Sequence, residues 1–176
     1  MPSFTRLAIW CAACFFLAAL AFPAAGPAWA KAPESFNGTV VKVIDGDSLL
    51  IKRGKKVLKV RLHQVDCPEL PQPFGKKAKA ETTKLVLGRM VRVEDPQRDP
   101  YYKGRLRAAV ILTDGRDLGM ELVRLGLAWE YRRYSENPLI TDLEKEARQA
   151  RIGLWADPNP QAPWEWRKKF YTKKPR

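Results

Sequence analysis

Charged side chains gather in three short segments of this chain, and their types could hold a metal ion beside a phosphate group. The first segment is Asp45-Gly46-Asp47, the second joins Arg61 to the run Asp66-Cys67-Pro68-Glu69, and the third is Gly104-Arg105. Carboxylate oxygens are the ligands that hard divalent cations such as calcium prefer. Guanidinium groups form paired hydrogen bonds to phosphate oxygens. The sequence therefore predicts a cation site that also binds a phosphodiester, provided that the fold brings the segments together.

Each segment also has a purely structural interpretation when it is taken alone. Asp-Gly is a common hairpin signal, so the first segment could be an ordinary turn. The acids of the second segment could be solvated residues of a surface loop, and Arg105 could be a surface residue beside a turn. His63 is the single histidine; without cysteine or histidine partners it is a poor zinc ligand, and we expect an ordinary strand residue.

Short β-strands must position these segments. Alternation is clearest at residues 58–63, where apolar residues at even positions alternate with Lys, Arg and His at odd positions, so Arg61 lies opposite the apolar face. Asp45 and Asp47 lie between two predicted strands, and in an extended chain their side chains point the same way. The predicted strands are residues 38–44, 48–52, 57–63, 89–93 and 106–112.

Three helices are predicted from the spacing of apolar residues: residues 76–87, residues 117–125, and a segment that begins near Asn137-Pro138. Each is followed by a glycine, which is typical of helix ends, and Asn before Pro is typical of a helix start. Five short strands with a helix after the third favour an α+β, mainly β fold: a five-stranded Greek-key barrel of the OB type with three helices. A generic α+β sandwich is the alternative.

The first 30 residues have the composition of a secretory signal peptide. Arg6 precedes an apolar run, no acid occurs before Lys31, and Ala28-Trp29-Ala30 offers a cleavage site. We therefore expect a secreted or periplasmic protein that has no stable membrane association once the segment is cleaved. The alternative is a protein anchored in the membrane by the uncleaved segment, because the apolar stretch is long enough to span a bilayer.

Export also bears on stability, charge and domain organisation. Cleavage leaves Cys67 as the one cysteine, so no intramolecular disulfide can form. It also removes Arg6, which leaves 31 Lys and Arg against 19 Asp and Glu, a net charge of +12 that favours a polyanionic partner. We expect a linker at residues 31–35, one domain at residues 36–155 and a basic, aromatic C-terminal extension at residues 156–176, in a monomer.

In their types and order, the charged segments are similar to those of the staphylococcal nuclease (thermonuclease) family. The similarity runs from about Phe36 to Trp166. It is carried by Val43-Ile44-Asp45-Gly46-Asp47-Ser48, Val60-Arg61-Leu62, Val65-Asp66-Cys67-Pro68-Glu69, Gly104-Arg105 and Leu122-Val123-Arg124-Leu125-Gly126-Leu127-Ala128. Two later runs resemble exported bacterial members: Gly153-Leu154-Trp155 and Pro163-Trp164-Glu165-Trp166-Arg167.

The resemblance implies a calcium-dependent nuclease that cuts DNA and RNA with little sequence preference and leaves 3′-phosphates. It implies that Asp47 and Asp66 bind calcium together with the backbone carbonyl of Cys67, while Asp45 lies in the outer shell. Cys67 stands where the family commonly has threonine. This difference keeps the carbonyl ligand and loses a hydroxyl hydrogen bond.

The resemblance assigns the scissile phosphate to Arg61 and Arg105, and the activation of the attacking water to Glu69. The family often has Asp-x-Tyr-Gly-Arg before the second arginine, whereas this chain reads Tyr-Tyr-Lys-Gly-Arg. Either Tyr102 or Lys103 is therefore expected to contact the phosphate.

Aromatic residues offer further contacts with a substrate. Tyr131 and Tyr134 are expected to form a wall against which a base stacks, with burial among other aromatic residues as the alternative. The aromatic residues of the C-terminal extension are expected to dock against the barrel. A rival hypothesis is a non-catalytic protein that binds nucleic acid or an acidic polymer on the same barrel. Retention of the acids and both arginines together argues against it.

Overall fold

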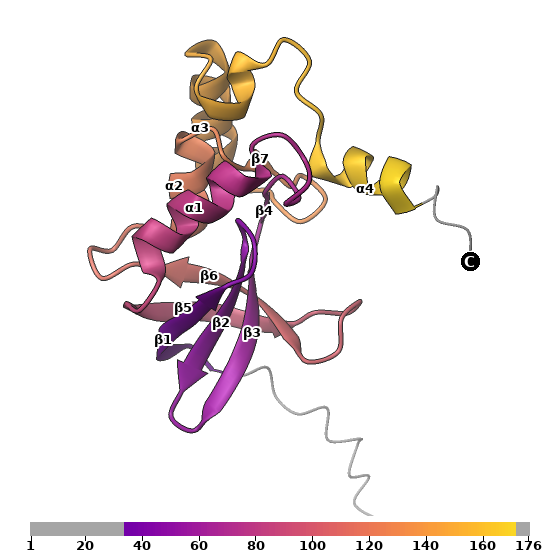
Figure 1. Cartoon of the computed structure of the whole chain (residues 1–176). Helices are drawn as coiled ribbons and strands as arrows, with labels where there is room; N and C mark the ends of the chain where they lie inside the picture. The colour runs from indigo at the N-terminus through magenta and orange to yellow at the C-terminus, as the bar shows by residue number, and fades with distance from the viewer. Residues whose placement is uncertain (1–33, 172–176) are drawn as a thin grey trace, which may run out of the picture. The chain divides into compact units, whose positions relative to one another are not determined.

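A closed five-stranded barrel forms the centre of the protein (Figure 1). The computed structural model describes residues 34–171, and the predicted signal segment lies outside the described residues. The strand order around the barrel is β1-β2-β3-β6-β5, with β3 and β6 parallel and the other neighbours antiparallel. The barrel strands are β1 (Phe36–Val43), β2 (Ser48–Arg53), β3 (Lys56–Leu62), β5 (Met90–Arg98) and β6 (Arg105–Ile111). The predicted OB-type barrel is therefore confirmed.

Alternating apolar residues fill the barrel interior. Leu49 and Ile51 of β2, Val60 of β3, Val93 of β5 and Val110 of β6 are all fully buried. Since successive strand side chains point to opposite faces, the residues between them face outward. Arg61 follows Val60 in this way and lies outside the apolar core.

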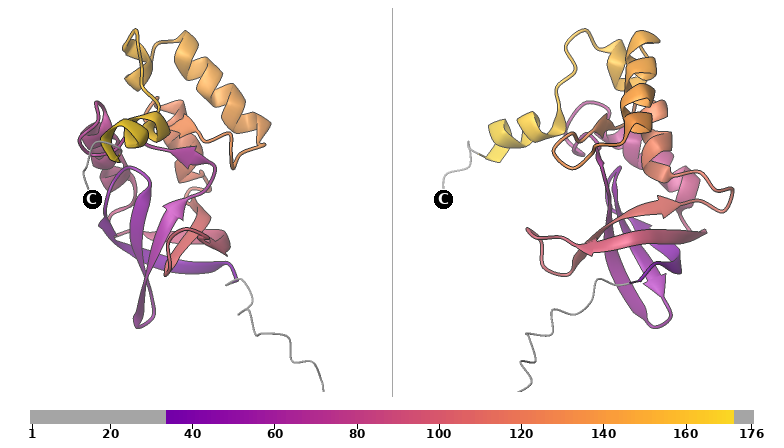
Figure 2. Two further views of the ribbon diagram at one scale, coloured as in Figure 1. Left: turned by 90° about the vertical axis from the view of Figure 1, so that its right-hand side faces the viewer. Right: turned by 180° about the vertical axis from the view of Figure 1, so that it is seen from behind.

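Three helices cover one end of the barrel: α1 (Gly75–Val86), α2 (Leu118–Arg124) and α3 (Pro138–Gln149) (Figures 1 and 2). The Asp117 side chain accepts a hydrogen bond from the Met120 N–H and caps α2, and Asn137 caps α3 in the same manner. Ala78, Leu122 and Ile140 join the barrel core. All three helices occur where the sequence predicts them.

The structure contains elements that the sequence did not predict. A fourth α-helix, α4 (Pro163–Tyr171), lies within the predicted C-terminal extension, after a short 3-10 helix at Gly153–Ala156. Two short strands, β4 (Val65–Asp66) and β7 (Trp129–Glu130), pair beside the barrel. Strand β5 also extends beyond its predicted end, because a bulge at Asp95, where φ is 44°, lets pairing with β6 continue after an irregularity.

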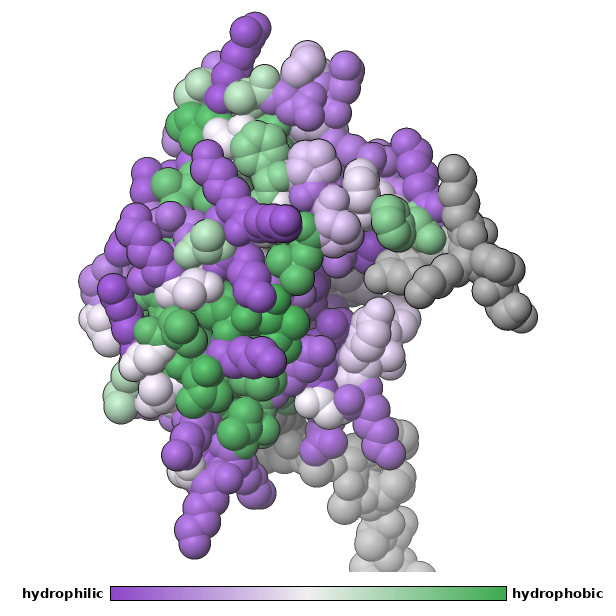
Figure 3. All heavy atoms as spheres, in the orientation of Figure 1, coloured by the Kyte–Doolittle hydropathy of each residue, from purple (hydrophilic) through white to green (hydrophobic). Residues whose placement is uncertain are grey.

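The surface combines charged and apolar regions. In the orientation of Figure 3, hydrophobic side chains gather over the lower part of the molecule and hydrophilic side chains surround them. Within residues 34–171, every helix is too short or too polar to cross a membrane.

Candidate active site

The turn between β1 and β2 is held tightly against the segment that follows β4. A Cβ atom at Gly46 would lie only 2.7 Å from Cys67 Cβ and 2.9 Å from Ala78 Cβ, so the position accepts no larger residue. The Thr82 hydroxyl donates to the Gly46 carbonyl at 2.7 Å. The Cys67 N–H donates to Asp47 Oδ2, also at 2.7 Å. Acids that are distant in sequence are thereby brought together, as the candidate site requires.

Arg61 joins two of these acids from the neighbouring strand. Its Nη1 donates to Asp47 Oδ1 at 2.6 Å, and its Nη2 donates to Asp66 Oδ1. The two carboxylates are almost completely buried, with side-chain exposures of 2% and 0%. Burial raises the pKa of Asp47 to about 8; Asp45 and Asp66 add to the rise, whereas Arg61 opposes it. Asp47 therefore lies where an additional positive charge would be favourable.

The donor chemistry around Asp47 fits a hard cation. The neighbouring acids present oxygen ligands, and calcium binds carboxylates, backbone carbonyls and water. Within the described part of the chain, no three His, Cys, Asp or Glu side chains are arranged to hold a metal ion by themselves. An ion at Asp47 and Asp66 would therefore need carbonyl and water ligands, and it would share both carboxylates with guanidinium groups.

A second guanidinium reaches the acids from α4. Arg167 Nη2 donates to Asp66 Oδ2 at 2.6 Å, and its Nη1 donates to Glu69 Oε1 at 2.8 Å and to Asp66 Oδ1 at 3.1 Å. Burial lowers the pKa of Arg167, but the hydrogen bonds to the two acids outweigh this effect and the pKa is raised. Arg167 therefore stays charged and links Asp66 to Glu69.

Arg105 is held at the start of β6 by an acid from the preceding loop. Its Nε and Nη2 lie 2.7 and 2.6 Å from Asp99 Oδ2, and the Tyr102 ring packs on the guanidinium at 3.9 Å. Burial raises the pKa of Asp99, but hydrogen bonds from the Tyr101 N–H and Arg105 outweigh it, so the pKa is lowered. Lys103 lines a neighbouring groove. Of the two residues left open by the sequence, Tyr102 is the one that contacts Arg105.

A cleft of about 520 Å³ opens beside these groups, and we call it the active-site cleft. Arg61, Glu69 and Arg105 all line it, as do Tyr131 and Tyr134. The two tyrosine rings contact each other edge to face at 4.9 Å. Six basic residues line the cleft against three acids, so an anion is favoured there. The basic lining residues are Lys59, Arg61, Arg105, Arg107, Arg133 and Arg167, and the acids are Asp45, Glu69 and Asp99.

The predicted residues divide into a cleft set and a buried set. Asp47 and Asp66 are buried behind Arg61, whereas Asp45 reaches the cleft. Cys67 is buried, and burial raises the pKa of its thiol. His63 also lines the cleft, where burial and then Arg107 lower its pKa.

Sequence reasoning missed three residues of this region. Asp99 pairs with Arg105, and Arg167 pairs with Asp66 and Glu69. Arg107 lines the cleft, and its guanidinium lies over the Tyr134 ring at 4.7 Å from the ring centre. The buried Nε of Arg107 has no hydrogen-bond partner among the described residues. Its spacing of two from Arg105 on a strand was a usable signal, because such residues share a face.

Comparisons with known proteins identify the family. The sequence model for "Staphylococcal nuclease homologue" matches residues 59–157. An "Uncharacterized endonuclease" of Escherichia coli O157:H7 is 37% identical over 139 residues, covering 79% of this chain and 90% of the relative. A "Micrococcal nuclease" of Shigella flexneri is 35% identical over 150 residues, covering 81% and 84%.

Similarity also extends to plants. The "Staphylococcal-like nuclease CAN1" of Arabidopsis thaliana is 40% identical over 113 residues, covering 64% of this chain but only 34% of the relative. The barrel, the acid and arginine cleft, and the match of the family model over more than half of the chain lead to one conclusion. This chain belongs to the staphylococcal nuclease family.

Proposed function

We propose that the protein is a calcium-dependent nuclease that hydrolyses phosphodiester bonds in both DNA and RNA and leaves 3′-phosphates. The observation that carries the proposal is the active-site cleft, where Arg61, Arg105 and Glu69 line one space beside the buried acids. Binding of a phosphodiester requires positive charge at the non-bridging oxygens, and hydrolysis requires a group that accepts a proton from water. The cleft offers both.

Calcium would be held by Asp47, Asp66 and the carbonyl of Cys67, with Asp45 in the outer shell. When bound, it supplies positive charge that stabilises the charge developing on the phosphate. The position of Asp47 beside Asp45 and Asp66 supports this assignment, because a cation would offset the repulsion between these acids in addition to the arginines that already pair with them.

The side chains of the cleft have distinct proposed roles in hydrolysis. Arg61 and Arg105 bind the non-bridging phosphate oxygens, and their acid partners hold each guanidinium in place before substrate arrives. Glu69 accepts a proton from water as the water oxygen attacks phosphorus. The bond from phosphorus to O5′ then breaks, and O5′ takes up a proton from solvent water, which leaves a 5′-hydroxyl on one fragment and a 3′-phosphate on the other.

Substrate binding beyond the scissile phosphate involves aromatic and basic residues. Tyr131 and Tyr134 line the cleft and would contact a base there; because Trp164 already stacks on one face of Tyr131, a base would stack on the other face of that ring or on Tyr134, an interaction that tolerates any sequence. A second groove continues from Arg105 along the barrel and has an excess of basic residues that would follow the phosphate backbone. Its basic residues are Arg53, Lys55, Lys56, Arg98, Lys103 and Arg105.

The proposal is tested by incubating plasmid DNA and a structured RNA with the protein in calcium or in chelator. We expect both to be shortened in calcium and intact in chelator. The fragments should prime a DNA polymerase only after phosphatase treatment, as fragments with 3′-phosphates do. Substrate that shifts in mobility without being shortened would identify a non-catalytic binder, and cleavage in chelator would refute calcium dependence.

Export and a monomeric state also belong to the proposal. The N-terminal composition supports cleavage after Ala30. N-terminal sequencing of the protein recovered from the periplasm or medium should begin at Lys31, and light scattering should give a monomer mass. Recovery in the membrane fraction with Met1 retained would instead support the anchored alternative.

A further inference from the structure

The C-terminal helix α4 is fixed beside the active-site cleft by aromatic contacts. The Trp164 ring stacks on Tyr131 at 5.4 Å with an interplanar angle of 6°, and it meets Trp129 of β7 edge to face at 5.6 Å. Just before the helix, the Gln161 carbonyl accepts a hydrogen bond from Gln72 at 2.6 Å. These contacts dock α4 without involving Arg167.

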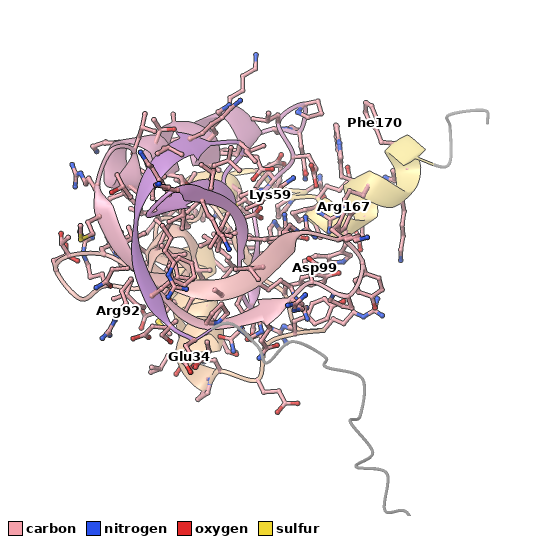
Figure 4. All side chains as sticks on the ribbon, turned by 90° about the horizontal axis from the view of Figure 1, so that it is seen from below. Glu34, Lys59, Arg92, Asp99, Arg167 and Phe170 are labelled. Carbon is pink, nitrogen blue, oxygen red and sulfur yellow. The ribbon has the colours of Figure 1, made fainter. Side chains whose placement is uncertain are left out.

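Docking places Arg167 on the side of the helix that faces the cleft. Figure 4 shows Arg167 where α4 meets the barrel, on the same side as Asp99, with Arg92 on the opposite side. Its side chain is 27% exposed, whereas Asp66 is fully buried and Glu69 is 29% exposed. The guanidinium therefore bridges a buried acid and an acid at the cleft.

The loop that carries Glu69 is tied to the C-terminal segment at two points. Gln72 accepts a hydrogen bond from the Glu69 N–H at 3.1 Å and donates to Gln161, which fixes the backbone. Arg167 then holds the side chain through Oε1. The glutamate side chain has several rotatable bonds. Because the guanidinium of Arg167 also donates hydrogen bonds to Asp66, it restricts rotation about them.

The pairing leaves part of Glu69 available for chemistry. The hydrogen bond from Arg167 uses Oε1, so Oε2 remains to accept a proton from water. A general base must lie within hydrogen-bond reach of that water, and small displacements are costly to the rate. Holding Oε1 therefore restricts the positions that Oε2 can take, in a residue that lines the cleft.

On this basis we infer that Arg167 is a positioning residue of the active site, supplied by the C-terminal helix, which holds Glu69 in its reactive orientation. The inference rests on the nuclease function proposed above. It makes α4 a part of the catalytic machinery, in addition to its packing on Trp129 and Tyr131.

The test compares steady-state cleavage of an oligonucleotide by the wild type and by Arg167→Ala, Arg167→Lys, Glu69→Gln and the Glu69→Gln/Arg167→Ala double variant. We expect Arg167→Ala to lower kcat by about 10- to 100-fold with little change in KM. Arg167→Lys should recover part of the loss, because it restores the charge but not the fork. Lys169→Ala, an exposed charge on the same helix, should match the wild type.

The double variant separates positioning from a general structural role. If Arg167 acts through Glu69, its removal has no further effect once Glu69 is a glutamine. An equal loss of kcat on removing Arg167 from the wild type and from Glu69→Gln would overturn the inference. Unchanged turnover in Arg167→Ala would also overturn it. So would increased turnover, because an increase would mean that the arginine blocks access to the acids. Hydrogen exchange in α4 should stay at the wild-type rate in Arg167→Ala because Trp164 still docks the helix.

The outcome for the wild type keeps the two proposals distinguishable. A wild type that leaves nucleic acid intact in calcium refutes the proposed function, and the inference about Arg167 with it. An active wild type with an equally active Arg167→Ala refutes only the inference.

Discussion

Removing Arg61 should destabilise the fold by an amount that depends on pH. Arg61→Ala deletes a cation that pairs with Asp47 at 2.6 Å and also with Asp66, two carboxylates with side-chain exposures of only 2% and 0%. Breaking a buried ion pair by deleting one partner costs about 3–5 kcal/mol. For a domain of this size, the melting temperature should fall by roughly 10–20 °C.

The pH dependence follows from the Asp47 carboxyl group. Burial raises its pKa from 3.8 to about 8, so the folded state binds a proton more tightly than the unfolded state does. Its contribution to stability is therefore greatest at low pH and falls as the pH rises between these two values. At about pH 5 Asp47 is neutral and gains less from its contact with Arg61. The decrease in the free energy of unfolding caused by Arg61→Ala should therefore be smaller at about pH 5 than at about pH 9.

The assay is thermal unfolding of both proteins at the two pH values in chelator, so that no divalent ion replaces the missing guanidinium. Lys84→Ala is the matched control, because it removes a cation paired at 3.2 Å with Glu81 on the surface, where Lys84 is 76% exposed. This control should lose less than about 1 kcal/mol at either pH. A loss in Arg61→Ala that equals the control's, or that is the same at both pH values, would refute the buried-pair reasoning.

Three further outcomes concern turnover and binding. Arg61→Ala and Arg105→Ala should each lower kcat by about 100-fold or more, measured on a short oligonucleotide at a temperature where both are folded; near-normal rates in both would contradict the phosphate clamp. Glu69→Gln should lower kcat yet keep calcium affinity in calorimetry, whereas lost binding would make Glu69 a ligand. Affinity for an uncleavable oligonucleotide should fall steeply with salt concentration, and a flat dependence would argue against the basic grooves.

The parts of the site that the sequence predicted depend on local patterns. The period-2 alternation around Arg61 placed it outside the core, because strand geometry leaves no other choice. Asp45 and Asp47 were recognisable because a glycine lies between them where two strands meet. The structure adds the reason for that glycine, which is the close approach of Cys67 and Ala78.

The parts that the sequence did not predict depend on long-range packing. Arg167 lies 101 residues from Asp66 along the chain, and no periodicity relates the two positions. Their meeting follows from Trp164, which docks α4 on Trp129 and Tyr131. The docking of Trp164 agrees with the expectation from composition, whereas Phe170 remains exposed. The consequence of this docking for the acids depends on contacts between segments far apart in the sequence, which no local pattern predicts.

The candidate site also extends beyond the segment by which the family is recognised. The family model matches residues 59–157, yet Asp47 precedes this range and Arg167 follows it. Both pair with residues inside the range, Asp47 with Arg61 and Arg167 with Asp66 and Glu69. Asp47 and Asp66 are buried, so each carboxylate is stabilised by the arginine paired with it. Each arginine is in turn positioned by the strand or helix that carries it. The charge balance of the cleft is thus set by the turn before β2 and by α4 together with the matched segment, which makes both flanking segments part of the site.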